Sequence, residues 1–184
     1  MKKALILLAP GFEEIEAVAP CDILRRGGVQ VTLCSCGESL TVDGSHGVPV
    51  TAERFLRDTD TRQYDAVIAP GGLRGVKNLL ACQPALDAMA EAYGEGRLVA
   101  AICAGPLVLT KAGVLEGKNA VCYPGMEGQM SGRMLEGHAF ALDGNVMTSR
   151  SAGTALDFGL ALLEYLTDGK TAEKVRSDIH YNEF

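Results

Sequence analysis

Short apolar segments alternate with segments of helical periodicity along the chain, and this alternation constrains the fold more than any other feature. Strands are expected near residues 3–9, 29–36, 65–69, 98–102, 119–123 and 145–149. Helices are expected near residues 13–27, 75–94, 106–113, 153–167 and 171–177. Such an alternation places parallel strands between two layers of helices. The sequence therefore predicts an α/β fold, a three-layer sandwich around a mostly parallel central sheet.

The segment from Leu40 to Val50 interrupts this alternation. It contains Asp43-Gly44 between β-prone residues, a pair typical of a tight turn, so we expect a β-hairpin that protrudes from the sandwich. Nothing in the sequence indicates what covers this hairpin, and an exposed apolar edge favours a second copy of the chain as its partner. A length of 184 residues without linkers or repeats predicts one domain over residues 1–184, and we expect that domain to form a homodimer.

Charge and composition narrow the classes of partner. The formal net charge is −6 and no cluster of Lys or Arg stands out, which argues against nucleic acid. The first apolar run is short and acidic residues follow it at once, so we expect a buried strand there and neither a secretion signal nor a membrane span. Six cysteines without such a signal indicate free thiols in a reducing compartment, and hence a cytoplasmic protein. Cys34 and Cys36 leave a zinc site open, but no second ligand pair stands at a familiar spacing, so we expect no metal.

Cys103 stands where the apolar run Val99-Ala-Ala-Ile102 ends and Gly105-Pro106 begins the next helix. A nucleophile at a strand-to-helix corner resembles a nucleophile elbow, in which a sharp turn holds the side chain over backbone N–H groups. Small residues on both sides of Cys103 fit that turn. The alternative is that Cys103 is a small buried hydrophobic residue, as most free cysteines are.

Glu16 lies in the middle of the apolar face of the first predicted helix. At 100° per residue it shares this face with Phe12, Pro20 and Ile23, whereas Glu14 lies opposite. A carboxyl group that faces the sheet loses hydration, so its pKa should rise and the protonated form can donate a hydrogen bond. The alternative is a misplaced helix start that leaves Glu16 in water.

The burial of Glu16 and the position of Cys103 fit one interpretation, because a thiolate at neutral pH needs hydrogen-bond donors around it. Protonated Glu16 would supply one such donor, and a helix N-terminus would supply others. We therefore expect the pKa of Cys103 to fall to about 3.5–7.5, against about 8.5 for a free cysteine. Cys103 should then be the most reactive thiol, while Cys21, Cys34 and Cys36 stay reduced inside the sandwich.

Four segments of the sequence stand out in combination: Ala4-Leu-Ile-Leu-Leu-Ala-Pro-Gly-Phe-Glu-Glu-Ile-Glu16, Asp65-Ala-Val-Ile-Ala-Pro-Gly-Gly72, Ala100-Ala-Ile-Cys-Ala-Gly-Pro106 and Thr148-Ser-Arg-Ser-Ala-Gly-Thr154. Together they resemble the DJ-1/ThiJ/PfpI superfamily, and specifically its DJ-1/ThiJ branch. The resemblance implies a flavodoxin-like sandwich, a homodimer and a reactive Cys103 beside protonated Glu16. It also implies an oxyanion pocket formed by the N–H groups of Gly72 and Ala104, with Gly71, Tyr123 and His46 in supporting positions.

The activities implied by the resemblance are conversion of reactive 2-oxoaldehydes without a cofactor and removal of glycation from proteins. The substrate would be a small aldehyde or a glycated group. The alternative is an oxidative-stress sensor or redox-regulated chaperone in which Cys103 oxidises to the sulfinate.

Two other activities fit the sequence poorly. The protease branch of the superfamily has His directly after the nucleophile, whereas Ala104 follows Cys103 here. An amidotransferase triad would need a His-x-Glu pair near the chain's end, and His180 and Glu183 are one residue too far apart.

Tyr123 stands where the DJ-1 branch often has His, and a phenol with a pKa near 10 is a poor base at pH 7. The chain has three histidines, His46, His138 and His180, and for each a surface or structural role is the default interpretation. His46 is singled out because the hairpin resembles the family's dimer contact, from which an arginine commonly reaches the partner's site.

Overall fold

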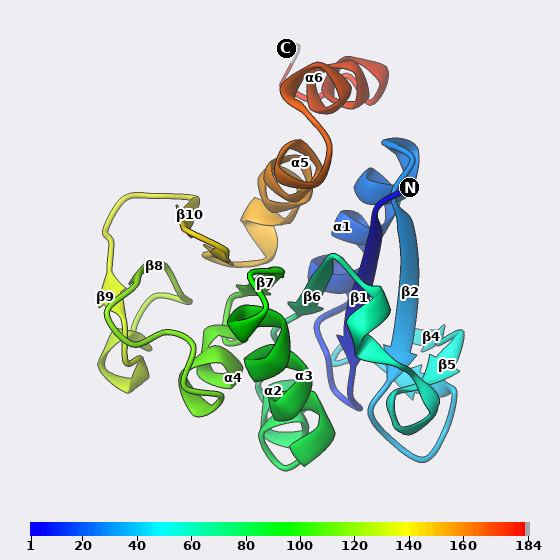
Figure 1. Ribbon diagram of the computed structural model, residues 1–184, viewed down its shortest axis with the longest axis vertical. Helices are drawn as coiled ribbons and strands as arrows, with labels where there is room; N and C mark the ends of the chain where they lie inside the picture. Colours follow the sequence, from blue (N-terminus) through cyan, green and yellow to red (C-terminus); the bar gives the residue numbers. More distant parts are fainter. Residues whose placement is uncertain (183–184) are drawn as a thin grey trace.

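The computed structural model, which describes residues 1–182, contains a seven-stranded central sheet (Figure 1). In spatial order its strands are β10 (Phe140–Asp143), β11 (Val146–Ser149), β7 (Leu98–Ile102), β6 (Ala66–Ala69), β1 (Lys3–Leu8), β2 (Gln30–Ser35) and β5 (Arg54–Phe55). All neighbours pair in parallel except β10, which is antiparallel to β11. The predicted α/β fold with a mostly parallel sheet is confirmed.

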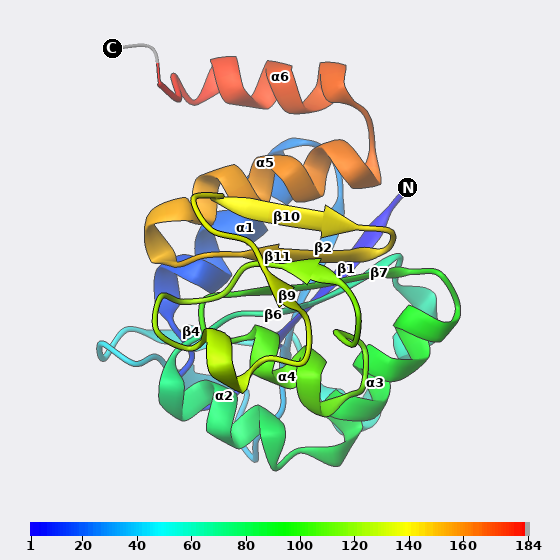
Figure 2. The same cartoon turned by 90° about the vertical axis from the view of Figure 1, so that its left-hand side faces the viewer.

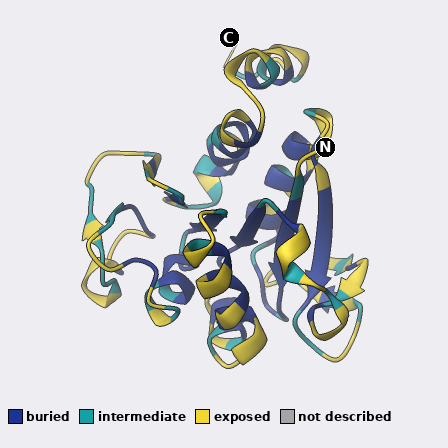
Figure 3. Ribbon diagram, in the orientation of Figure 1, coloured by how far each residue is buried: buried dark blue, intermediate teal, exposed yellow. Residues whose placement is uncertain are grey.

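Helices cover both faces of this sheet (Figure 2). One layer contains α1 (Glu14–Arg26) and α5 (Ala155–Leu166), with α6 (Gly169–Asp178) outside α5; the other contains α2 (Leu73–Leu80), α3 (Gln83–Gly94) and α4 (Pro106–Lys111). Strand side chains alternate between the two layers, as the pleat requires. In β1, Ile6 and Leu8 pack toward α1 and α5, whereas Leu5 and Leu7 pack toward α2 to α4. Burial is concentrated in the strands and the inner faces of the helices (Figure 3).

The protruding hairpin is present as β3 (Thr41–Asp43) and β4 (Pro49–Thr51), paired antiparallel. We expected that no other part of the chain covers the hairpin, and for one face of the hairpin this expectation is wrong. Val42 is buried, and the Gly11 N–H donates to the Asp43 carbonyl at 2.7 Å, which ties the hairpin to the start of the first helix. The other face remains open, with Val48 56% exposed.

Three sequence predictions need correction. The helix expected over 75–94 is two helices, α2 and α3, because the chain turns at Cys82 and Pro84 stands in the first turn of α3. The strand expected over 119–123 is only β8 (Asn119–Ala120), which pairs with β9 (Arg133–Met134) outside the central sheet. The edge strands β5 and β10 were not predicted. The structure also contains the 3-10 turns Leu56–Asp58, Thr61–Gln63, Glu127–Gln129 and Ala152–Thr154.

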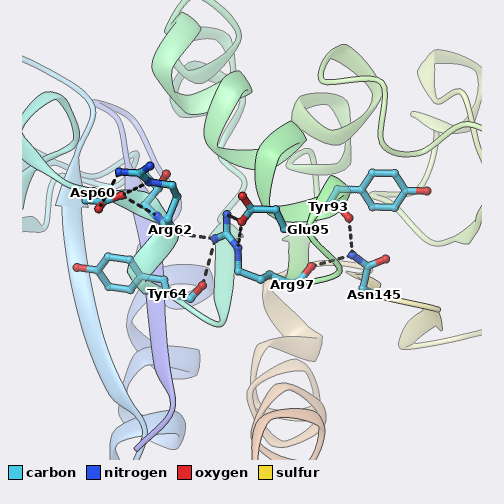
Figure 4. A network of polar contacts seen from close by, with 8 residues as sticks. Asp60, Arg62, Tyr64, Tyr93, Glu95, Arg97 and Asn145 are labelled. Carbon is cyan, nitrogen blue, oxygen red and sulfur yellow. Dashed lines mark hydrogen bonds and ion pairs between the residues drawn. The ribbon is translucent and has the colours of Figure 1, made fainter.

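A polar network fixes the amino ends of β6, β7 and β11 (Figure 4). Arg97, just before β7, donates to the carbonyl oxygens of Thr61 and Tyr64 at 3.0 and 3.1 Å. Asn145, just before β11, donates to the carbonyl oxygens of Tyr93 and Arg97 at 3.0 and 2.8 Å. These bonds hold the loops at one end of the sheet and leave its carboxyl ends free for chemistry, as in other open parallel sheets.

In residues 1–182, no helix is both long enough and apolar enough to cross a membrane. Glu183, the residue considered above for an amidotransferase triad, lies outside the described residues.

Candidate active site

Cys103 occupies the predicted corner between β7 and α4. Its φ is +65°, a left-handed conformation that costs a residue with a side chain about 1–3 kcal/mol and persists only where the surroundings impose it. Two hydrogen bonds impose it here: the Cys103 N–H donates to the Ser149 carbonyl at 2.9 Å, and the Cys103 carbonyl accepts the Tyr123 N–H at 2.8 Å. The strand, turn and helix required of a nucleophile elbow are therefore all present.

Glu16 is 1% exposed, which excludes the alternative that it lies in water. Its Oε2 accepts the N–H of Gly71 at 2.8 Å, and its carboxyl group is close enough to the Cys103 thiol for each group to change the pKa of the other. Gly71 lies tightly between the two, since a Cβ built on it would stand 2.4 Å from Glu16 Oε2 and 2.8 Å from Cys103 Cβ. The structure thus brings together Glu16, Cys103 and Gly71 from three separate elements.

Burial dominates the electrostatics of Glu16 and Cys103. It raises the pKa of Glu16 from 4.5 to about 7, against the lowering effect of the hydrogen bonds from Cys103 and Gly71. Burial, then the charge of Glu16 and the hydrogen bond to it, raise the pKa of Cys103 to about 12, although the N–H groups of Ala104 and Gly72 lower it. The expectation that donors alone would lower the pKa of Cys103 is wrong, because it left out burial and the Glu16 charge.

The two values describe a pair that holds one negative charge over a wide pH range. The pair loses one proton near pH 7 and the second only near pH 12, since two adjacent charges cannot both be accommodated. When the single charge lies on sulfur, it faces the N–H groups of Gly72 and Ala104 and the acid form of Glu16. A proton can therefore pass between the carboxyl and the thiol without a change in the net charge of the site.

The raised pKa of Glu16 makes stability depend on pH. Because the folded chain holds this proton up to about pH 7 and the unfolded chain releases it near 4.5, the free energy of unfolding should fall as pH rises from 4.5 to 7. The expected loss is about 3 kcal/mol, at 1.36 kcal/mol per pKa unit. Urea unfolding of wild type and Glu16→Gln across this range measures it. If the two curves stay parallel, the carboxyl group titrates at the same pKa in both states.

A cavity of about 680 Å³ opens over Cys103. Its lining includes the predicted residues Gly72, Ala104, Tyr123 and His46. Tyr123 is half-exposed, its backbone N–H donates to the Cys103 carbonyl, and the residue lines the cavity. Sequence reasoning missed Arg74 and Gln129, which also line the cavity. The only signal for Arg74 was its position two residues after Gly72, in the first turn of α2.

His46 lines this cavity but is held by its own chain. Its Nδ1 lies 3.0 Å from Glu14 Oε2, and its N–H donates to Glu14 Oε1 at 2.7 Å. Burial of Glu14 opposes ionisation, but the hydrogen bonds from His46 and Val48 outweigh it and lower the pKa of Glu14 to about 2. The bond to Glu14 raises the pKa of His46. Glu14, assigned from helical geometry to the outer face, is thus the residue that anchors the hairpin.

The structure also shows where the residues considered for metal binding and the histidine His138 lie. In residues 1–182, Glu13, Glu14 and His46 are the only group of three or more potential metal ligands with atoms within 4.8 Å of one another, and the hairpin bonds explain their proximity. Cys34 and Cys36, considered for zinc, form no such group. His138 lines a different hollow, with its Nδ1 2.7 Å from the Glu136 carbonyl oxygen.

The sequence also matches a known protein family. The model of the DJ-1/PfpI family matches residues 2–165. The chain belongs to the DJ-1/PfpI family. It is 37% identical to Protein DJ-1alpha of Drosophila melanogaster over 95% of this chain and 82% of that protein. It is 39% identical to Protein DJ-1 homolog B of Arabidopsis thaliana, of whose length it spans only 40%.

Solved DJ-1 structures extend the likeness to three dimensions. The crystal structure of Drosophila melanogaster DJ-1beta superposes with a TM-score of 0.93 at 34% identity, over 97% of each chain. An oxidised DJ-1 of Toxoplasma gondii superposes with a TM-score of 0.94 at 32% identity, over 99% of this chain and 100% of that one. The flavodoxin-like sandwich implied by the sequence resemblance is confirmed.

Proposed function

We propose that this DJ-1/PfpI member converts small 2-oxoaldehydes to 2-hydroxy acids without a cofactor. The observation that carries the proposal is that the buried Glu16 lies beside Cys103 under a cavity lined by Gly72 and Ala104, whose N–H groups are within reach of the Cys103 sulfur. A volume of about 680 Å³ accommodates a small aldehyde, and also a glycated side chain on a larger substrate. Removal of such glycation would use the same chemistry.

The first step is transfer of the Cys103 proton to the Glu16 carboxylate, followed by addition of the resulting thiolate to the aldehyde carbon. The C–S bond forms, and the carbonyl π electrons become an alkoxide that the N–H groups of Gly72 and Ala104 bind. Glu16 in its acid form donates its proton to this alkoxide and becomes a carboxylate. The product is a hemithioacetal.

Isomerisation and hydrolysis complete the reaction. The Glu16 carboxylate takes the proton from the former aldehyde carbon and returns one to the neighbouring carbon, while the hydroxyl proton on the first oxygen passes to the 2-oxo oxygen. The 2-oxo hemithioacetal thereby becomes a 2-hydroxyacyl thioester. Water then cleaves the C–S bond, so that the sum is one aldehyde plus one water giving one 2-hydroxy acid. A base with a pKa near 7 suits both directions of proton transfer at neutral pH.

The test is to incubate the purified protein with methylglyoxal and assay lactate. We expect lactate from wild type and none above background from Cys103→Ser. Lactate formation by Cys103→Ser at the wild-type rate, or none from folded wild type, would overturn the proposal.

A second candidate function is redox sensing, favoured by the partial exposure of Cys103 and by its backbone donors. The N–H groups that stabilise a thiolate also stabilise a sulfinate, and one relative of the same fold is an oxidised DJ-1. In this case mild peroxide should add two oxygens at Cys103 with no need for turnover. A protein that oxidises this way but forms no lactate would favour the sensor, or a redox-regulated chaperone.

Tyr123→Phe should leave aldehyde turnover within about tenfold of wild type. The Tyr123 backbone N–H, which the substitution keeps, makes the hydrogen bond to Cys103, and a lost neutral side-chain hydrogen bond is worth only about 0.5–1.5 kcal/mol. Initial rates of lactate formation measure the effect. A loss of several orders of magnitude would mean that the phenol transfers the proton and that Glu16 does not.

We also propose that the chain forms a homodimer through the junction of α1 and the hairpin. Ile15 and Val18 on α1 are 54% and 46% exposed. Val48 on the hairpin is 56% exposed, and its N–H donates to Glu14, the neighbour of Ile15, at 3.3 Å. Sedimentation at micromolar concentration should show a dimer for wild type and a monomer for Ile15→Glu. Leu142→Glu, at an exposed apolar position on β10, is the matched control and should stay dimeric. A monomeric wild type would refute the dimer.

A further inference from the structure

A second group of thiols lies apart from Cys103. Cys36 follows the end of β2, and Cys82 stands at the turn between α2 and α3; both are free and partly buried. The two line one surface hollow of about 180 Å³ together with Arg57, Glu38 and Leu56. None of the residues that line this hollow lines the cavity over Cys103. Cys36 was expected inside the sandwich, and its place in a surface hollow corrects that expectation.

The two thiols lie close enough together in this hollow to differ strongly in acidity. The interaction with Cys36 lowers the pKa of Cys82 to about 6 against the effect of burial, and the N–H of Ala85 in the first turn of α3 adds to this. The same interaction, with burial, raises the pKa of Cys36 well above its ordinary value. The Cys36 sulfur itself lies 4.0 Å from the Cys34 carbonyl oxygen. At neutral pH the arrangement is therefore a Cys82 thiolate beside a Cys36 thiol.

A third cysteine, Cys34, lies near these two but is buried and not acidic. Cys34, on β2, is fully buried, and its sulfur lies 3.7 Å from the Thr59 hydroxyl oxygen. Burial raises the pKa of Cys34, which keeps it a thiol. The neighbourhood thus contains one reactive thiolate, one partly exposed thiol beside it and one inert thiol.

We propose that Cys36 and Cys82 form a second redox centre, which a hydroperoxide converts to an intramolecular disulfide. The Cys82 thiolate attacks the peroxide, the O–O bond breaks, and with one proton taken up the products are a sulfenic acid at Cys82 and water. Cys36 then attacks the Cys82 sulfur and loses its proton, the S–O bond breaks, and a second water leaves. Overall, two thiols and one hydrogen peroxide give one disulfide and two waters.

Formation of this disulfide requires the two sulfurs to move closer together. The sulfurs must come to about 2.05 Å. Cys36 lies in a bend after the last residue of β2, and Cys82 in a turn before the first residue of α3. The Cys36 N–H donates to the Leu8 carbonyl at 2.8 Å, and the Cys82 carbonyl accepts the Ala85 N–H at 3.0 Å, so the closer approach falls to the two side chains.

The test uses the full chain with Cys103→Ser, so that oxidation at Cys103 does not contribute. The reduced protein is treated with hydrogen peroxide, free thiols are blocked with iodoacetamide, and the intact mass and peptides are measured. We expect the loss of two hydrogens and a linked peptide pair that contains Cys36 and Cys82. Unlinked Cys36 and Cys82 peptides, after a dose that oxidises Cys103 in the wild-type chain, would overturn the proposal.

Single replacements separate the roles of the two thiols in the same background. Cys36→Ser should let dimedone trap a sulfenic acid at Cys82, because the second thiol is missing, whereas Cys82→Ser should leave Cys36 unmodified. Cys21→Ser, at a buried position on α1, is the control and should form the disulfide as before. Circular dichroism of each variant shows that it is folded. Oxidation of Cys36 in folded Cys82→Ser at the rate of the parent would contradict the assigned roles, and because no readout here is aldehyde turnover, the result is independent of the function proposed for Cys103.

Discussion

Replacement of Glu16 by leucine is expected to lower lactate formation from methylglyoxal by about a thousandfold. General acid–base catalysis contributes about 10²–10⁴-fold, and within residues 1–182 Glu16 is the carboxyl group that changes the pKa of the Cys103 thiol. Its pKa of about 7 lets it hold and release a proton at neutral pH, which leucine cannot do. Leucine occupies a similar volume in this buried position, so the fold should survive. Initial rates, with circular dichroism as a check of folding, measure the effect.

Glu16→Gln separates the proton from the hydrogen bond. The amide still offers an N–H donor toward Cys103 but transfers no proton, so turnover should fall nearly as far as with leucine. Oxidation of Cys103 by peroxide should persist in Glu16→Gln and weaken in Glu16→Leu, because a donor to the oxidised sulfur remains only in the former. A Glu16→Gln protein with near wild-type turnover would show that another group moves the proton.

The layers of the sandwich and the two central residues of the site could be predicted from sequence. Apolar strand segments such as Val99–Ile102 can be recognised from their local composition. Their alternation with helices is compatible with only a few sheet topologies. The apolar face of α1 located Glu16, and the strand-to-helix corner located Cys103. In both cases the signal lies within about ten residues, where helix and strand periodicity apply.

Features that depend on distant parts of the chain could not be predicted in this way. Glu14 points away from the apolar face of α1, and it is buried because Ser45, His46 and Val48 of the hairpin close over it. Periodicity within one helix contains no information about a hairpin 30 residues later. The pKa of Cys103 was misjudged for a related reason: the sequence indicates donors, but burial and the distance to a charge exist only in the folded chain.

Other differences between the expected and the observed elements have local signals in the sequence. Pro84 stands inside the helix expected over 75–94, and proline in a helix interior ends or kinks the helix. Asp143-Gly144 is a pair typical of a tight hairpin turn, and it joins β10 to β11. The four residues of β10 alternate between exposed and less exposed positions, as in an edge strand, and this pattern was the local signal for β10. By contrast, no local pattern distinguishes the two residues of β8 from a longer strand, because strand length there depends on pairing with β9.

Gly71→Ala is expected to lower turnover by about a hundredfold while the chain stays folded. Gly71 does not have a positive φ, so its backbone conformation is open to alanine. The effect comes from space: the new methyl group would stand 2.4 Å from Glu16 Oε2 and 2.8 Å from Cys103 Cβ, both far inside van der Waals contact. Glu16 and Cys103 must therefore separate, and a displacement of about 1 Å between reacting groups can cost about 10²-fold.

Gly94→Ala is the matched control, because Gly94 ends α3 and a Cβ there meets no atom within 4 Å. It should keep the wild-type rate, which shows that a glycine-to-alanine change is not harmful in itself. In Gly71→Ala the pH dependence of Cys103 alkylation by iodoacetamide should also change, since the carboxyl charge that raises the pKa of the thiol moves away. The midpoint should shift to lower pH, even though turnover falls. If Gly71→Ala keeps both the wild-type rate and the wild-type midpoint, the close packing of Glu16 against Cys103 has no part in the chemistry.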